Sequence, residues 1–151
     1  MFPSHDPPAS EAPFDNRFYW SRKTDGSLTE KSLTDINVVD KNGKEVVDPK
    51  TGKQMIQLGL KSIWITQTKQ TANSLLSESD WMVTRKAEKG TAIPDATTTY
   101  RDSVRTACNT IETKINACSN LTEFMALFDA PKDSDGIVTG NPPIFDFPKE
   151  S

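Results

Sequence analysis

The chain has 151 residues, of which 34% are apolar, and its mean hydropathy is −0.58. This length suits one domain of ordinary size, and the low apolar content predicts a modest core that partners complete. The formal net charge of −3 disfavours a general nucleic-acid binder, which carries a basic surplus. No apolar run approaches the ~20 residues that span a bilayer, and the N-terminus shows no secretory signal. We therefore expect a protein made and kept in a cytosol, with neither a membrane nor a nucleic acid as its partner.

Residues 1–35 read as an extended arm that is rich in proline and aromatic residues. Four prolines within residues 1–20 exclude a helix or a central strand there. A disordered arm is normally poor in aromatic residues, so this arm is expected to bind a partner or its own domain. The candidate binding side chains are Phe14, Phe18, Tyr19 and Trp20. Residues 21–35 are polar and predict a loop with a turn at Asp25-Gly26.

Residues 36–47 predict a small β-hairpin. Two runs rich in β-branched residues, 36–39 and 44–47, flank Asn42-Gly43, which is a strong hairpin signal. A second turn is predicted over 48–52, and residues 53–55 are a candidate third strand. A unit this small is marginal alone, so it must pack on the helices or on a neighbouring molecule.

Apolar residues at helical spacing predict two long helices, over 57–76 and over 95–118. Pro94-Asp95 marks the start of the second, because proline fits the first helical turn and a carboxylate is favourable there. Ser79-Asp80-Trp81 joins the two helices, and we expect the Trp81 ring to lie between them. The charged segment 85–90 is expected to be a solvated face or a partner contact. The apolar stripe of the second helix suits packing on the first helix or on another copy.

A short third helix is predicted over 121–128, with Asn120 and Glu123 as a capping pair. Residues 129–151 then form a second extended arm, in which Phe145 and Phe147 are candidate partner-binding side chains. The expected organisation is thus an arm over 1–35, a body over 36–128 and an arm over 129–151. The fold class is mainly α: a helical hairpin of two long helices and a short third, with a small β-hairpin and extended arms.

The sequence shows no arrangement typical of a catalytic, metal or cofactor site. Its single histidine, His5, has no cysteine or second histidine nearby. Cys108 and Cys118 lie on one expected helix, about 15 Å apart along its axis, which is too far for a disulfide. Gly52-Lys53 lacks the other residues of a phosphate-binding loop. We expect a protein that is not an enzyme and that uses no metal and no cofactor.

One motif runs across the expected helix junction. It consists of Leu75-Leu76, Ser79-Asp80-Trp81, Tyr100-Arg101 and Arg105. This pattern resembles the phage tail-assembly chaperone family, in which a helix ending in Leu-Leu-x-x-Ser-Asp-Trp leads to one that opens with Tyr-Arg and carries a further Arg four residues on. A longer pattern also resembles small virion-associated proteins of contractile-tailed phages: Asp80-Trp81, Arg85, Glu88, Ala92, Pro94 and Tyr100. The resemblance covers roughly residues 56–118.

The motif also has a physical interpretation. In an antiparallel helix pair, Asp80 can accept charge-assisted hydrogen bonds from Arg101 or Arg105, which share a helix face. Trp81 and Tyr100 would then meet near the helix junction. Such a cluster serves either as a clasp that maintains the fold or as a recognition surface for a fibre or baseplate protein.

The resemblance implies a non-enzymatic structural protein of a bacteriophage tail, near the baseplate or the tail-fibre attachment region. Its partners would be other tail, baseplate or fibre proteins, or copies of itself, and its location the virion tail after synthesis in the host bacterial cytoplasm. The alternative is a transient tail-fibre assembly chaperone that is not retained in the virion. The additional helix and the two arms depart from the chaperone pattern and favour a protein that stays in the particle.

Overall fold

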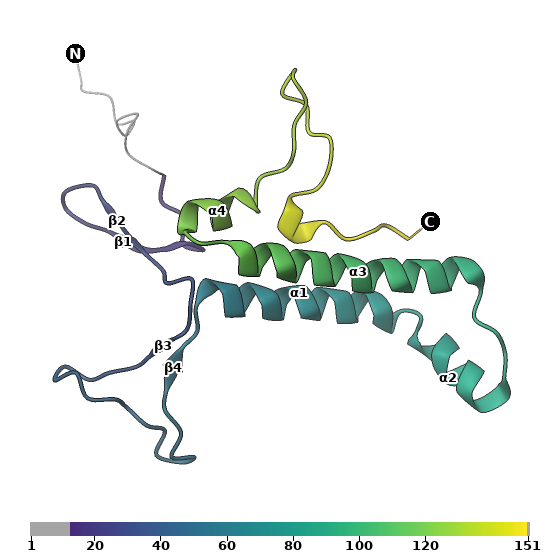
Figure 1. Cartoon of the computed structure of the whole chain (residues 1–151), viewed down its shortest axis with the longest axis horizontal. Coiled ribbons are helices and arrows are strands. Elements are labelled where there is room, and N and C mark those ends of the chain that lie inside the picture. Colours follow the sequence, from purple (N-terminus) through teal and green to yellow (C-terminus); the bar gives the residue numbers. More distant parts are fainter. Residues whose placement is uncertain (1–12, 151) are drawn as a thin grey trace. The chain divides into compact units, whose positions relative to one another are not determined.

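The computed structural model describes residues 13–150 (Figure 1). Within this range the chain forms four α-helices, one short 3-10 helix and two small two-stranded antiparallel sheets. The prediction of a mainly helical protein with a little β structure is correct at this level. The chain divides into two compact units between Ser62 and Ile63, and each is described separately. His5 and the other residues before 13 lie outside the described range.

The first unit begins with a β-hairpin, where the sequence predicted an extended arm and a loop. Strand β1 (Tyr19–Arg22) pairs with β2 (Leu28–Glu30), so the prediction of a loop over 21–35 is wrong. The aromatic and β-branched residues of both strands favour extended backbone and outweigh the polar character of the segment. The predicted turn at Asp25-Gly26 is correct, and Gly26 adopts the left-handed conformation that closes it.

A branched β-arm follows, and its pairing differs from the predicted hairpin. Strand β3 (Ile36–Asn37) pairs with β4 (Ile56–Gln57) and not with residues 46–47. The Asn42-Gly43 turn forms as predicted, but it closes only a short loop, with a bridge between Val39 and Glu45. The loop over 48–53 returns the chain so that β4 lies beside β3. The β3–β4 pairing thus replaces the predicted pairing of residues 36–37 with residues 46–47.

The arm branches at a junction of three backbone segments. Val38 N–H donates to the Met55 carbonyl, Met55 N–H to the Val46 carbonyl, and Val46 N–H to the Val38 carbonyl, at 2.8, 2.9 and 2.9 Å. The side-chain amide of Gln54 also lies within 2.9–3.1 Å of the three carbonyl oxygens. A ring of hydrogen bonds therefore holds the junction, which no apolar core covers.

The base of the arm fixes the start of helix α1 (Leu60–Ser77). The first N–H groups of the helix donate to the backbone of the preceding loop, Leu60 to the Ser32 carbonyl at 2.9 Å and Lys61 to the Leu33 carbonyl at 3.0 Å. Gly59 N–H donates to the Asp35 carboxylate at 2.8 Å. These bonds, with residues 56–57 in a strand, start the helix three residues later than predicted.

The second unit is built on α1 from Ile63 onward and on α3 (Asp95–Ala117), which lie side by side (Figure 1). Lys69 and Glu112 form an ion pair between them at 3.8 Å. The predicted start of α3 at Pro94-Asp95 is correct, and the residues at its apolar spacing are buried: Val104, Ile111 and Ile115. Helix α4 (Leu121–Ala126) is capped as predicted, because Glu123 N–H donates to the Asn120 side chain at 2.8 Å.

Helix α2 (Asp80–Lys89) stands where the sequence predicted a turn and a charged segment. Asp80 lies in its first turn and Lys86 and Lys89 in its last, so the charges suit the helix dipole. Gly90 ends the helix in the left-handed conformation, with its N–H bonded to the Lys86 carbonyl. The favourable charges and the glycine C-cap thus support a helix in a segment that buries no residue.

The C-terminal arm is folded back on its own helices and is not extended as predicted. Residues 129–142 form a loop with one bridge between Lys132 and Val138, and the short helix η1 (Pro143–Phe145) follows. Ile144 is 2% exposed, and its N–H donates to the Leu127 carbonyl at 3.0 Å. Burial of this side chain offsets part of the cost of ordering the segment. Within residues 13–150, no helix combines the length and apolar character that crossing a membrane requires.

Candidate interaction site

Arg101 is the centre of the motif cluster, and it lies almost fully buried on α3 at 7% exposure. Its Nη1 donates to the Leu76 carbonyl at 2.8 Å and to the Ser79 hydroxyl at 2.7 Å. Its Nη2 donates to the Asp80 carboxylate at 3.0 Å. One guanidinium thus binds a carbonyl at the end of α1, which also accepts the Ser79 N–H at 3.1 Å, and the first residue of α2, which makes it a link among three helices.

The structure separates the two arginines of the motif. Asp80 pairs with Arg101 as one of the two expected arrangements had it, but Asp80 itself is 60% exposed. Arg105 instead contacts Asp102 on its own helix, at 3.3 Å. The exposed Arg105–Asp102 pair contributes little to stability. Of the two arginines, Arg101 is therefore the one that links the helices.

Trp81 does not lie between the helices, contrary to the prediction. Its side chain is 55% exposed on α2 and stacks against the Arg85 guanidinium, 4.8 Å from the ring centroid. No ring contact joins Trp81 to Tyr100 among the residues that the structure describes. Because α2 continues the chain as a helix, Trp81 follows the direction of α2 and leaves the α1–α3 interface.

Tyr100 precedes Arg101 on α3 and is half-buried. Burial raises the pKa of the Tyr100 hydroxyl, and the nearby charges of Glu150 and Glu78 raise it further. The side chain is therefore neutral at physiological pH and is suited to hydrogen bonding and not to ionic contact. It serves the packing near the cluster and brings no reactive group to it.

The aromatic residues of the predicted N-terminal arm fall into two groups. Phe18 is buried at 2% exposure and Tyr19 is half-buried, so neither presents a fully exposed ring. Phe14 and Trp20 remain 48% and 55% exposed. The Trp20 ring stacks with the Lys31 ammonium at 4.6 Å, an exposed pair on the β1–β2 hairpin.

The aromatic residues of the C-terminal arm contact the second unit. Phe145 lies 6.1 Å from Trp64 and 5.8 Å from Phe128, with edge-to-face ring geometry. Trp64 and Phe128 contact each other at 4.8 Å, so the three rings form one cluster. Phe145 nevertheless keeps 46% of its surface exposed.

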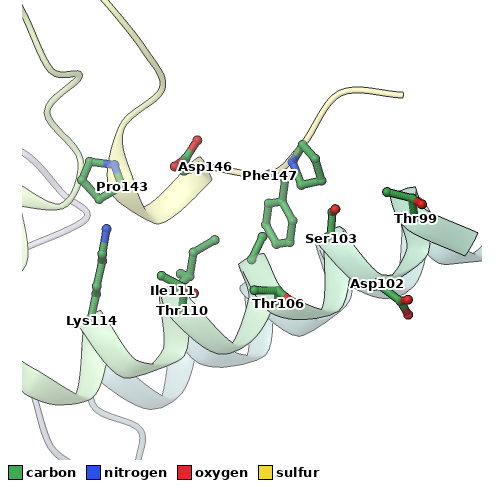
Figure 2. Close-up of a pocket in the computed structure, with 12 residues that line it drawn as sticks. Thr99, Asp102, Ser103, Thr106, Thr110, Ile111, Lys114, Pro143, Asp146 and Phe147 are labelled. Atoms are coloured by element: carbon green, nitrogen blue, oxygen red, sulfur yellow. The ribbon is translucent and has the colours of Figure 1, made fainter. Parts of the chain in front are cut away.

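A groove of about 570 Å³ lies between α3 and the C-terminal segment (Figure 2). Hydroxyl groups spaced along α3 form its floor: Thr99, Ser103, Thr106 and Thr110. The Phe147 ring points toward α3 from the opposite wall, whereas the Asp146 carboxylate points away from it (Figure 2). The groove is polar along one side and apolar along the other, and it holds no pair of catalytic groups.

Metal-ligating groups and cysteines are the other candidate features of the described residues. No group of three or more histidine, cysteine or acidic residues among residues 13–150 is placed to hold a metal ion. Both cysteines are free, as the spacing argument predicted. Burial raises the pKa of the Cys108 thiol, and the negative charge of Glu112 raises it further, so this cysteine is a poor nucleophile.

Two elements of the cluster were not anticipated from the sequence. The first is the pair of Arg101 acceptors, the Leu76 carbonyl and the Ser79 hydroxyl, because a bond from a distant side chain to a helix-end carbonyl has no sequence signature. The second is the Trp81–Arg85 stack, which their spacing of four residues makes possible once the segment is read as helical. Gly90, placed after Lys86 and Lys89, was the available signal for that helix.

Comparison of this chain with protein-family models, with curated proteins and with solved structures finds no match.

Proposed function

We propose that this chain is a non-enzymatic structural subunit of a bacteriophage tail, at the baseplate or the tail-fibre attachment region. It acts by contacting neighbouring tail, baseplate or fibre subunits. The proposal combines the motif around Ser79-Asp80-Trp81 and Tyr100-Arg101 with the distribution of exposed apolar side chains. It places the protein in the virion tail after its synthesis in the host cytoplasm.

The observation that carries the proposal is the uncovered β3–β4 stem. In an antiparallel pair, opposite residues share a face and successive residues alternate between faces. Ile36 pairs with Gln57 and Ile56 with Asn37, so the two isoleucines lie on opposite faces, at 47% and 51% exposure. Neither face of the stem is covered, and a two-stranded stem alone is marginal in water.

Exposed apolar residues continue along the rest of the arm. They are Val39, Val47, Met55 and Leu58, each between 43% and 56% exposed. Among the described residues of the whole chain, fourteen large apolar side chains are exposed whereas ten apolar residues are buried. Burial is therefore incomplete in the isolated chain, which supports a subunit that lies among neighbours.

Quantitative mass spectrometry of purified particles, beside the soluble lysate, tests the proposal. A fixed ratio to a major tail protein in the particles is the expected result. Detection in the lysate with fibre protein, and absence from particles, would instead support the transient chaperone, for which the exposed Trp81 within the motif is the specific observation. Absence from both would reject both functions.

A matched pair of variants sharpens this test. Ile56→Lys replaces an exposed apolar residue of the stem, and Thr51→Lys adds the same charge at an exposed polar position of the same arm. Neither change removes a buried side chain, so both proteins should remain folded. We expect Ile56→Lys to lower incorporation into particles and Thr51→Lys to leave it unchanged.

A further inference from the structure

Helix α2 presents a groove that is lined by an exposed aromatic ring and by charged side chains. The groove has a volume of about 370 Å³ and is lined by one face of the helix: Trp81, Thr84, Arg85, Glu88 and Lys89. Trp81 is 55% exposed, and α2 buries none of its residues. The groove thus combines an exposed aromatic surface with two cations and one acid, in a chain whose net charge is negative.

The complementary surface lies in the loop between α4 and η1. Asp133 and Asp135 are exposed there, beside Ile137 and Val138 at 62% and 56% exposure. The Asp133 carboxylate accepts hydrogen bonds from the Asp135 and Ile137 N–H groups, both at 2.9 Å, which gives the loop a defined turn. The 132–138 loop holds Lys132 and these two aspartates, so its net charge is −1, and it presents the acidic groups next to two adjacent apolar side chains.

The groove and the loop lie toward opposite ends of α3. Helix α2 precedes α3 and α4 follows it, and 23 helical residues span about 34 Å. Figure 1 shows α2 at one end of α3 and α4, from which the loop leaves, at the other. A contact between these two surfaces is thus a contact between copies.

We propose that the α2 groove of one copy binds the 132–138 loop of a second copy, so that the chain self-associates head to tail. The cations of the groove meet the aspartates of the loop, and Ile137 and Val138 cover the Trp81 ring. Where each copy uses its groove on one neighbour and its loop on another, the contact is heterologous and generates a ring or an open array. Its role in a tail rests on the proposed function.

Sedimentation velocity of the full chain, over a range of concentrations and salt, tests the contact. We expect weak self-association that diminishes as salt rises, because screening shortens the reach of exposed charges. Lys89→Glu and Asp135→Lys should each weaken association at least about tenfold, through like charges placed opposite each other. The double variant Lys89→Glu/Asp135→Lys, which exchanges the charges, should restore it to within about threefold of the original.

Lys86→Glu is the matched control. Lys86 lies in the same last turn of α2 as Lys89 but does not line the groove. Both changes put an unfavourable charge at the helix C-terminus, so circular dichroism should show equal effects on folding. Only Lys89→Glu should reduce association.

A chain that stays monomeric at every concentration would overturn the proposal. So would single variants that associate normally, or a double variant that is not restored. Detection in particles at a fixed ratio, together with a monomer in solution, would reject the self-contact and leave the proposed function intact. Salt-sensitive self-association of a chain that is absent from particles would support the self-contact and reject the proposed function.

Discussion

The Arg101 guanidinium lies 2.8 Å from the Leu76 carbonyl oxygen, so a side chain of α3 satisfies a backbone group at the end of α1. The Ser79 N–H donates to the same carbonyl at 3.1 Å, and the two bonds together define how the chain leaves α1 and enters α2. The Ser79 hydroxyl and the Asp80 carboxylate complete the donor–acceptor set on the same guanidinium. Arg101 is consequently the residue on which the geometry of the junction depends.

Arg101→Met should destabilise the protein by about 2–4 kcal/mol, because it removes the three guanidinium hydrogen bonds that join α3 to the end of α1 and the start of α2. Arg105→Met makes the same replacement four residues away, at an exposed pair, and should cost less than about 0.5 kcal/mol. Denaturant unfolding followed by circular dichroism measures both. Equal effects of the two variants would show that Arg101 is not the link among the helices.

Ile144→Ala should release the C-terminal segment from α3, because it removes the buried anchor of η1. Truncating a buried isoleucine costs about 2–4 kcal/mol. Hydrogen exchange of peptides covering 141–150 should therefore become much faster, whereas that of α3 should change little. Ile137→Ala, at a 62% exposed position, is the control and should leave exchange of the segment unaltered. Slow exchange in Ile144→Ala would mean that other contacts hold the segment.

Gly59→Ala should disrupt the base of the β-arm. A Cβ atom at this position would overlap the Thr34 carbonyl group and lie 2.5 Å from the Leu33 carbonyl oxygen, and backbone cannot yield as a side chain can. We expect a loss of at least about 2 kcal/mol in thermal unfolding experiments. Gly140→Ala meets only Pro131 Cγ at 3.4 Å and should be tolerated. A stable Gly59→Ala protein would contradict the close approach at the arm base.

The Asp35 carboxylate should make the arm base sensitive to acid. The Gly59 N–H bond lowers the pKa of Asp35, and the Ser62 hydroxyl lowers it further. A lowered pKa in the folded state means that the contribution is complete above the ordinary value of about 3.9 and is lost as the pH falls through the lower folded value. The Gly59 amide proton shift, followed by NMR, should titrate below that ordinary value.

Asp35→Asn provides the control for this titration. The Gly59 amide shift should then lose its acid transition, and the stability difference from the original protein should shrink as the pH falls below about 4. A midpoint for Gly59 at or above the ordinary aspartate value would contradict the carboxylate's role at the arm base.

Local sequence rules were sufficient where one element depends on residues a few positions apart. Pro94-Asp95 starts α3, the 3/4 spacing of Val104, Ile111 and Ile115 defines its buried face, and the turns at Asp25-Gly26 and Asn42-Gly43 form where the sequence places them. Each depends on backbone preferences or capping bonds within one or two turns of chain.

The tertiary structure decided what depends on competition between distant groups. Ile36-Asn37 pairs with Ile56-Gln57 because the 48–53 loop returns the chain, and Asp80 pairs with Arg101 and not with Arg105 because only Arg101 also meets the carbonyl at the end of α1. Likewise, the C-terminal segment that was predicted to be an extended arm is packed on the helices, where Ile144 is buried. Such outcomes follow from the summed burial and hydrogen bonding of the whole chain, which no short stretch of sequence specifies.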